Sequence, residues 1–99
     1  MQGKIHKTAQ GYNSFEMHEE KNDFIFQFAT ILEKEYGFTM SGQPAFGLDG
    51  VFWDAYKENL RLTVGWDIWS GAFVFAHSAQ GDPYIEKMQA YCLQHKLCT

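Results

Sequence analysis

The side chains able to carry acid, base or metal chemistry are scattered along this sequence of 99 residues and form no motif. None of the four histidines stands four residues from another metal ligand. Cys92 and Cys98 lack the C-x-x-C spacing that structural metal sites use. We therefore expect no bound metal and no cofactor, with Cys92 as a small core residue and Cys98 near the chain end.

Three aspartates offer the best case for catalysis, because Asp49, Asp54 and Asp67 can converge at one end of a sheet to act as acid and base or to hold a cation. Asp49 in Leu-Asp-Gly is more typical of a turn, and carboxylates on strands are commonly solvated. Ser70 in Trp-Ser-Gly has no G-x-S-x-G context and no evident base. The sequence thus predicts a protein without enzymatic activity.

Charge and composition exclude several classes of partner. The net charge is −4 and no run of Lys or Arg forms, which argues against nucleic acid. The apolar runs 24–26 and 72–76 are too short to span a bilayer, so we expect no membrane partner. With no signal-like N-terminus and only two cysteines, we predict a cytoplasmic protein. Residues 1–99 are expected to form one domain, with 1–13 loosely ordered.

Two helices frame the predicted domain. Apolar residues recur at helical spacing over 22–36, where Asn22 or Asp23 is the expected N-cap and Gly37 ends the helix. A second helix over 83–96 has a strong start signal, with Asp82 as N-cap and Pro83 in the first turn. Its expected buried residues are Ile85, Met88 and Cys92.

Between the helices the apolar residues alternate as in strands. We predict an antiparallel meander of about four strands, at 38–40, 51–56, 60–68 and 72–76. Residues 14–18 alternate as well, and they fit either a short edge strand or the opening turn of the first helix. With both helices on one face of the sheet, the fold is an α+β two-layer sandwich.

The register of the first hairpin follows from its apolar pattern. A two-residue turn at Glu58-Asn59 pairs Lys57 with Leu60, which makes one face of these strands wholly apolar. A three-residue turn would bring Asp54 onto the core face, so we reject it. Phe52, Asp54 and Tyr56 then lie on the face away from the helices.

The second hairpin has two registers open to it. We favour a three-residue loop of Trp69, Ser70 and Gly71, with Gly71 in the left-handed conformation of a β-bulge. Ile68 then pairs with Ala72, Trp66 with Val74 and Val64 with Ala76, and Phe75 lies opposite Gly65. In this register Phe73 and Phe75 face away from the helices, whereas a two-residue turn would bury both.

Aromatic and acidic side chains therefore share the face away from the helices. Aromatic anchors beside charged groups are typical of protein-contact patches. We predict that the partner-binding residues are Asp54, Tyr56, Asp67, Trp69, Phe73 and Phe75. The alternative is that the N-terminal segment folds over this face and forms a second small core with Ile5, Tyr12, Phe15 and Met17.

The order of elements in part of the chain is similar to that of a known family. The most informative segment is LRLTVGWDIWSGAFVFAHSAQGDPYIEKMQAYC, which has a strand, a Trp-x-Gly turn, a strand, Gly-Asp and a helix. The similarity of layout extends over residues 22–97. This layout resembles the small immunity proteins that bacteria encode beside polymorphic or contact-dependent toxins. The resemblance implies a non-enzymatic inhibitor that binds a toxin domain, often a basic nuclease, and covers or distorts its active site.

Two other functions are consistent with the sequence. One is a small-molecule-binding domain or minor enzyme, with Trp53, Trp66 and Tyr84 lining a pocket between the sheet and the helices. The other is a homodimer of unknown role, formed through the exposed aromatic side chains. Identification of a toxin gene directly upstream would favour the immunity-type function.

Overall fold

A computed structural model describes residues 4–17 and 24–95 of the chain. Its helices and strands run in the order β1 (Lys4–Lys7), β2 (Asn13–Met17), α1 (Phe24–Tyr36), β3 (Thr39–Met40), β4 (Ala45–Phe46), β5 (Gly50–Lys57), β6 (Leu60–Asp67), β7 (Gly71–Ala76), a single 3₁₀ turn (Ala79–Gly81) and α2 (Asp82–Gln94). The fold is α+β, as predicted.

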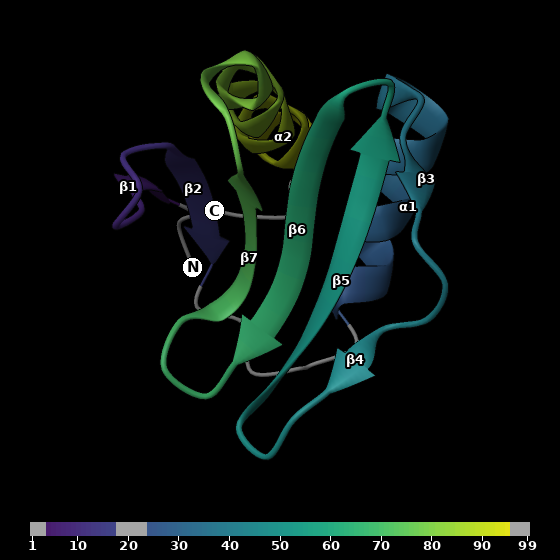
Figure 1. Cartoon of the computed structure of the whole chain (residues 1–99). Coiled ribbons are helices and arrows are strands. Elements are labelled where there is room, and N and C mark those ends of the chain that lie inside the picture. Colours follow the sequence, from purple (N-terminus) through teal and green to yellow (C-terminus); the bar gives the residue numbers. More distant parts are fainter. Residues whose placement is uncertain (1–3, 18–23, 96–99) are drawn as a thin grey trace.

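All seven strands belong to one antiparallel sheet, in the order β1-β2-β7-β6-β5-β3, and β4 pairs with β5 beside β3 (Figure 1). The predicted number of about four strands is too low. The sequence pattern missed β1 because its residues, KIHK, are mostly polar. It also missed β4, which is only two residues long and follows Pro44.

Both helices cover the same face of the sheet. Helix α1 packs against β5, β6 and β7, and α2 packs against β1, β2 and β7 (Figure 1). Their buried side chains share one core with strand residues that point the same way, including Leu62, Val64 and Val74. The sandwich therefore has two layers, and the described residues leave the other face of the sheet without a covering element. We call that uncovered side the open face.

The first helix buries the predicted stripe, which includes Phe24, Phe28 and Leu32. It ends at Gly37, whose φ of +76° is the left-handed conformation expected there. The proposed N-cap residues, Asn22 and Asp23, lie outside the described residues. In the second helix Ile85, Met88 and Cys92 are buried as predicted.

The start of α2 differs from the prediction. Asp82 is the first residue of the helix and not its N-cap, which is Gly81. The Asp82 carboxylate instead accepts a hydrogen bond of 2.8 Å from the backbone N–H of Asn13 and lies 3.9 Å from Lys7 Nζ. This side chain therefore attaches the first hairpin of the chain to α2 instead of capping its own helix.

The hairpin between β5 and β6 has the predicted register, with Lys57 opposite Leu60. The register between β6 and β7 is shifted by two residues from the prediction: Trp66 pairs with Ala72, Val64 with Val74 and Asp67 with Gly71. Because a shift of two residues preserves the side of the sheet on which each side chain lies, Phe73 and Phe75 still project onto the open face.

The N-terminal strands extend the sheet and do not fold over the open face. Strand β2 pairs with β7, with Phe15 opposite Val74 and Met17 opposite Ala72. Phe15 and Met17 are buried in the helix-side core, and Ile5 and Tyr12 pack against it. The described part of the N-terminus therefore adds to the main core, and the alternative of a second core on the open face is wrong.

Neither helix of the described residues is long and apolar enough to cross a lipid bilayer.

Candidate protein-contact surface

The centre of the open face is built by the alternate residues of three long strands, and Ser14 and Glu16 of β2 lie beside Phe75 and Phe73. From β5 it receives Phe52, Asp54 and Tyr56; from β6, Arg61, Thr63, Gly65 and Asp67; from β7, Phe73 and Phe75. The residues opposite each other in register form rows across the sheet, so the face has an aromatic row, a polar row and an acidic end.

The aromatic row, formed by Phe52 and Phe73 on either side of Gly65, crosses the middle of the open face, with Phe75 in the next row. The ring of Phe73 lies 5.8 Å from that of Phe52 and 5.9 Å from that of Phe75. Phe73 lies directly opposite Gly65 and covers it: a Cβ added to this glycine would be 2.5 Å from Phe73 Cζ. The sequence predicts Phe75 opposite Gly65. Because the register is shifted by two residues, Phe73 occupies that position instead.

Burial distinguishes the aromatic residues of the open face from one another. Phe73 is only 6% exposed because its neighbours cover it, so its ring supports the face from within. Phe52 and Tyr56 are 46% and 43% exposed, and they present apolar surface to solvent. Phe52 and Tyr56 are therefore the accessible rings, and Phe73 packs beside Phe52.

A polar network lies beside the aromatic row. Asp54 accepts hydrogen bonds from Arg61 Nη2 at 2.9 Å and from the Thr63 hydroxyl at 2.6 Å. The same hydroxyl lies 2.7 Å from His77 Nε2. Since Thr63 has one hydroxyl proton and donates it to Asp54, Nε2 of His77 must carry the proton that it donates to Thr63.

The network has consequences for its charge. Burial lowers the pKa of His77, the Arg61 guanidinium lowers it further, and Asp54 opposes them. The uncharged imidazole is therefore favoured at neutral pH, and the ring also packs 5.0 Å from Phe75. Thr63 is buried and both of its hydrogen-bond roles are taken, so it is not placed to act as a nucleophile.

At the other end of the open face, Asp67 organises the turn between β6 and β7. Its Oδ1 accepts hydrogen bonds from the backbone N–H groups of Trp69 and Ser70. Gly71 has a φ of +74°, the left-handed conformation that we predicted. This hydrogen bonding holds Trp69 in the turn, where the residue is 70% exposed.

The structure brings only some of the predicted contact residues together. Asp54 and Phe75 lie on either side of Thr63, whereas Tyr56 lies one row beyond them. Asp54 lies opposite Thr63, and Asp67 is four residues farther along β6, a separation of about 13 Å. Asp49 lies in the turn next to Asp67, so the three aspartates do not converge on one site. Within residues 4–17 and 24–95, no group of His, Cys, Asp or Glu side chains is arranged to hold a metal ion.

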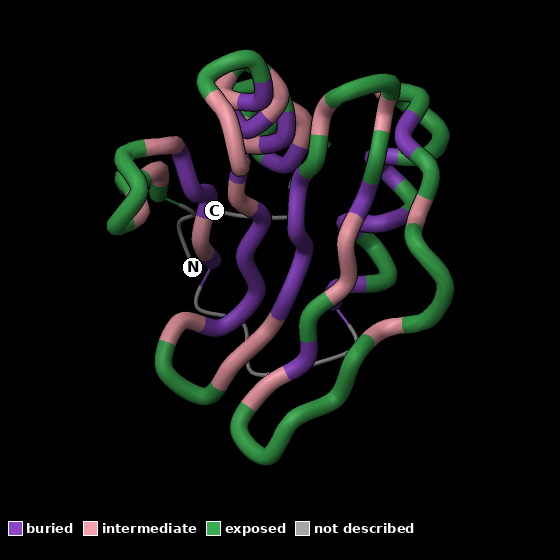
Figure 2. Tube along the Cα trace, in the orientation of Figure 1, coloured by how far each residue is buried: buried purple, intermediate pink, exposed green. Residues whose placement is uncertain are grey.

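Sequence reasoning missed several exposed apolar residues near Trp69. Phe46 and Ile68 are 71% and 59% exposed, and Leu48 is fully exposed. Figure 2 shows the two turns that carry Leu48, Ile68 and Trp69 as exposed segments at one end of the sheet. The sequence Gly-Leu-Asp-Gly did contain a signal for Leu48. A turn is usually formed by polar residues, so a leucine in a turn has no role in the core and is expected to be exposed.

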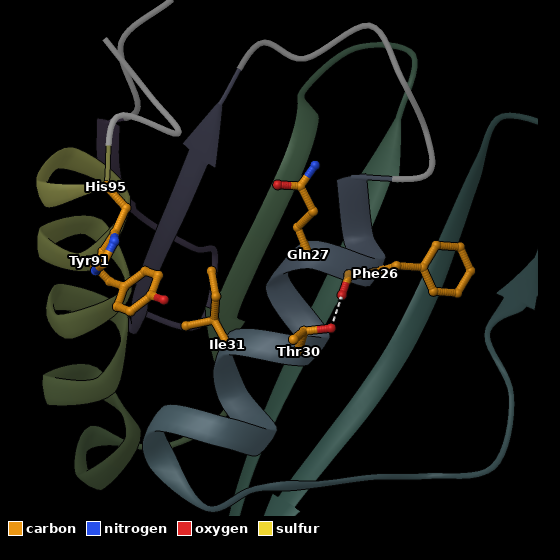
Figure 3. A pocket seen from close by; sticks show the side chains of 6 residues that line it. All are labelled: Phe26, Gln27, Thr30, Ile31, Tyr91 and His95. Atoms are coloured by element: carbon orange, nitrogen blue, oxygen red, sulfur yellow. Dashed lines mark hydrogen bonds between the residues drawn. The ribbon is translucent and has the colours of Figure 1, made fainter.

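A cavity of about 470 Å³ lies between the two helices, on the side away from the open face (Figure 3). It is lined by Phe26, Gln27, Thr30, Ile31, Tyr91 and His95. Tyr91 and His95 are stacked with ring centres 4.0 Å apart, whereas the Phe26 ring points away from α2. The cavity is therefore a shallow groove with an aromatic wall on the α2 side.

The residues expected to line a pocket under the helices have other roles. The indole N–H of Trp53 donates to the backbone oxygens of Ser41 and Gly42. Tyr84 packs edge-on against Phe38, with ring centres 5.1 Å apart. Trp66 and Tyr84 line neither the groove between the helices nor a cavity of about 220 Å³ beside β5, which Trp53 does line.

The comparisons with known proteins give no significant match: no family model, no curated protein and no solved structure resembles this chain closely enough to assign it.

Proposed function

We propose that this protein is a non-enzymatic binding domain that recognises another protein through its open face, as an immunity-type inhibitor of a basic bacterial toxin domain. The observation that carries the proposal is the pair of half-exposed rings, Phe52 and Tyr56, on a sheet face that no described element covers. Rings of this kind, set among polar neighbours, are typical anchors of protein interfaces.

Electrostatics supports a basic partner. Asp54 carries the charge in the middle of the face, although Arg61 offsets part of it. The chain as a whole has a net charge of −4, which favours rapid association with a protein of opposite charge. Rapid capture is what an inhibitor of a toxic enzyme requires, because the enzyme acts until it is bound.

The test is co-expression with the toxin domain encoded next to the gene of this protein, followed by a binding measurement with the purified pair. We expect growth to be restored by the unaltered chain, and binding to weaken about tenfold or more in Phe52→Ala/Tyr56→Ala. Phe26→Ala is the matched control, because Phe26 is 47% exposed but lies on α1. Absence of such a toxin gene, or of binding to its product, would refute the proposal.

The groove between the helices favours a second candidate, a small-molecule-binding domain. Its volume of about 470 Å³ is in the range of ligand pockets. A ligand there would raise the melting temperature of the protein without any protein partner. A thermal-shift screen with metabolites tests this candidate, and Tyr91→Ala should abolish any shift that arises in the groove.

A further inference from the structure

Four of the eight large apolar side chains that are exposed in the described residues gather at one end of the sheet: Phe46, Leu48, Ile68 and Trp69. They lie in and beside the β4–β5 and β6–β7 turns. The backbone N–H of Ile68 donates to the oxygen of Asp49 at 3.1 Å, so the two turns are joined. We call these four residues the hairpin tip.

Hydrogen bonds hold the hairpin tip in one shape. The Gly47 N–H donates to the Gly50 oxygen at 2.7 Å, which closes the first turn. The Asp67 carboxylate closes the second turn through the N–H groups of Trp69 and Ser70. Apolar side chains on turns that are already ordered lose little entropy when a partner binds, so this geometry suits an anchor.

The charge around the hairpin tip selects among partners. No Lys or Arg occurs between residues 37 and 56 or between 62 and 86, and the charged residues of the two turns are Asp49 and Asp67. Anionic lipid headgroups would be repelled by these carboxylates. A second copy of the chain, docked tip to tip by a two-fold axis, would bring like charges together. A cationic protein surface is complementary.

We propose that the hairpin tip is a docking site for a cationic protein segment in which apolar side chains alternate with Lys or Arg. The choice of a protein partner rests on the function proposed above, and the inference adds the location of the anchor and the chemistry that it recognises. The apolar side chains of the segment would cover Leu48 and Trp69, and its cations would lie beside Asp49 and Asp67.

Two synthetic peptides of equal length test the chemistry, one alternating Lys and Leu and the other alternating Glu and Leu. Each is titrated into the full-length, ¹⁵N-labelled protein. We expect the lysine peptide to shift the backbone amide signals of 46–49 and 68–70, with affinity that falls as salt is added. The glutamate peptide should leave these signals unchanged, because it meets carboxylates of the same sign.

Variants locate the site independently of folding effects, because the changed side chains are exposed. Leu48→Ser/Trp69→Ser should weaken binding of the lysine peptide about tenfold. Leu93→Ser is the matched control, since Leu93 is 52% exposed on α2, and it should bind as the unaltered protein does. Asp67→Asn should lower the affinity less, because the amide oxygen still closes the turn while the charge is lost.

Several outcomes would overturn the inference. These are equal binding of the two peptides, amide shifts outside the hairpin tip, or unchanged affinity in the double variant. Binding through the tip to vesicles of phosphatidylcholine and phosphatidylglycerol would assign it to membranes, and self-association lost in the double variant would assign it to a second copy. No toxin is present in these measurements, so a failed toxin rescue and a failed peptide titration remain distinguishable.

Discussion

On the helix side of the sheet, Phe28 has no exposed surface. The centre of its ring lies 5.2 Å from that of Phe24 and 6.1 Å from that of Phe15. On the open side, Phe52 meets the single ring of Phe73 at 5.8 Å and keeps 46% of its surface exposed. Rings on the first side are enclosed by two layers of structure, whereas rings on the second lie on one layer.

The difference in exposure between Phe28 and Phe52 implies that the first contributes mainly to folding stability and the second mainly to binding. A ring enclosed on all sides contributes its full transfer free energy to folding, because nothing remains exposed for a partner to cover. A half-exposed ring contributes less to folding and retains surface that association can bury. The same residue type therefore serves two purposes in one small domain, and substitutions on the two sides should have different effects.

The largest expected difference is between the two phenylalanines themselves. Phe28→Ala should lower the free energy of unfolding by about 3–5 kcal/mol, because it leaves a cavity in the core. Phe52→Ala should lower it by less than about 1.5 kcal/mol, since the residue is already 46% exposed to water. Urea denaturation followed by circular dichroism measures both. Equal losses would show that the open face is as important for folding as the core.

Gly65 offers the next largest effect, because it lies beneath the Phe73 ring. An added Cβ would be 2.5 Å from Phe73 Cζ and 2.8 Å from the Val51 oxygen, so ring or backbone must move. We expect Gly65→Ala to cost about 1–3 kcal/mol in urea denaturation, as overpacked sites do. Gly47→Ala is the control, because its nearest atom is the Gly50 oxygen at 3.6 Å. A neutral Gly65→Ala would contradict the packing described for the aromatic row.

A smaller loss is expected at the turn that carries Trp69. Gly71 has a φ of +74°, and a side chain in the left-handed region costs about 1–2 kcal/mol. Gly71→Ala should therefore lower the free energy of unfolding by that amount, and it should broaden or shift the amide signals of Trp69 and Ser70. If the variant is as stable as the unaltered protein, the turn has a conformation other than the one described.

The smallest effect concerns pH. The pKa of His77 is lowered in the folded protein, so below about pH 6.5 the unfolded chain takes up a proton before the folded one does. The free energy of unfolding should then fall as the pH decreases through this range towards the folded pKa. His77→Gln should show a smaller decrease between pH 7 and pH 5.5 in urea denaturation. An identical decrease in both proteins would assign the pH dependence to other groups.

Amphipathic pattern made part of this fold predictable. The pairing of Lys57 with Leu60 followed from requiring one apolar face, because a three-residue turn would have brought Asp54 inside. The same reasoning could not distinguish the predicted register of the next hairpin from the observed one, which differ by two residues. Both satisfy the alternation of the strands, so only the geometry of the Ile68–Trp69–Ser70 turn separates them.

The candidate site was predictable to a similar degree. The choice of a three-residue loop with Gly71 in the left-handed conformation predicted that Phe73 and Phe75 project onto the open face, as they do. It gave no indication that Phe73 would be 6% exposed, because that depends on the ring of Phe52 beside it and on the missing side chain of Gly65. The hairpin tip was not predicted because two turns far apart in sequence, at Leu48 and Ile68, meet only in the folded sheet.

The outer strand β1 has a consequence for how these molecules behave at high concentration. Lys4 and Lys7 stand at its two ends with exposed side chains, and one edge of β1 has no neighbouring strand among the described residues. An unpaired strand edge can template fibrils by hydrogen bonding to the edge of another molecule. In an antiparallel pairing of two β1 strands, the lysines of one copy would lie close to those of the other. The repulsion between them disfavours aggregation at this edge, which helps to keep a domain rich in exposed aromatic rings in solution.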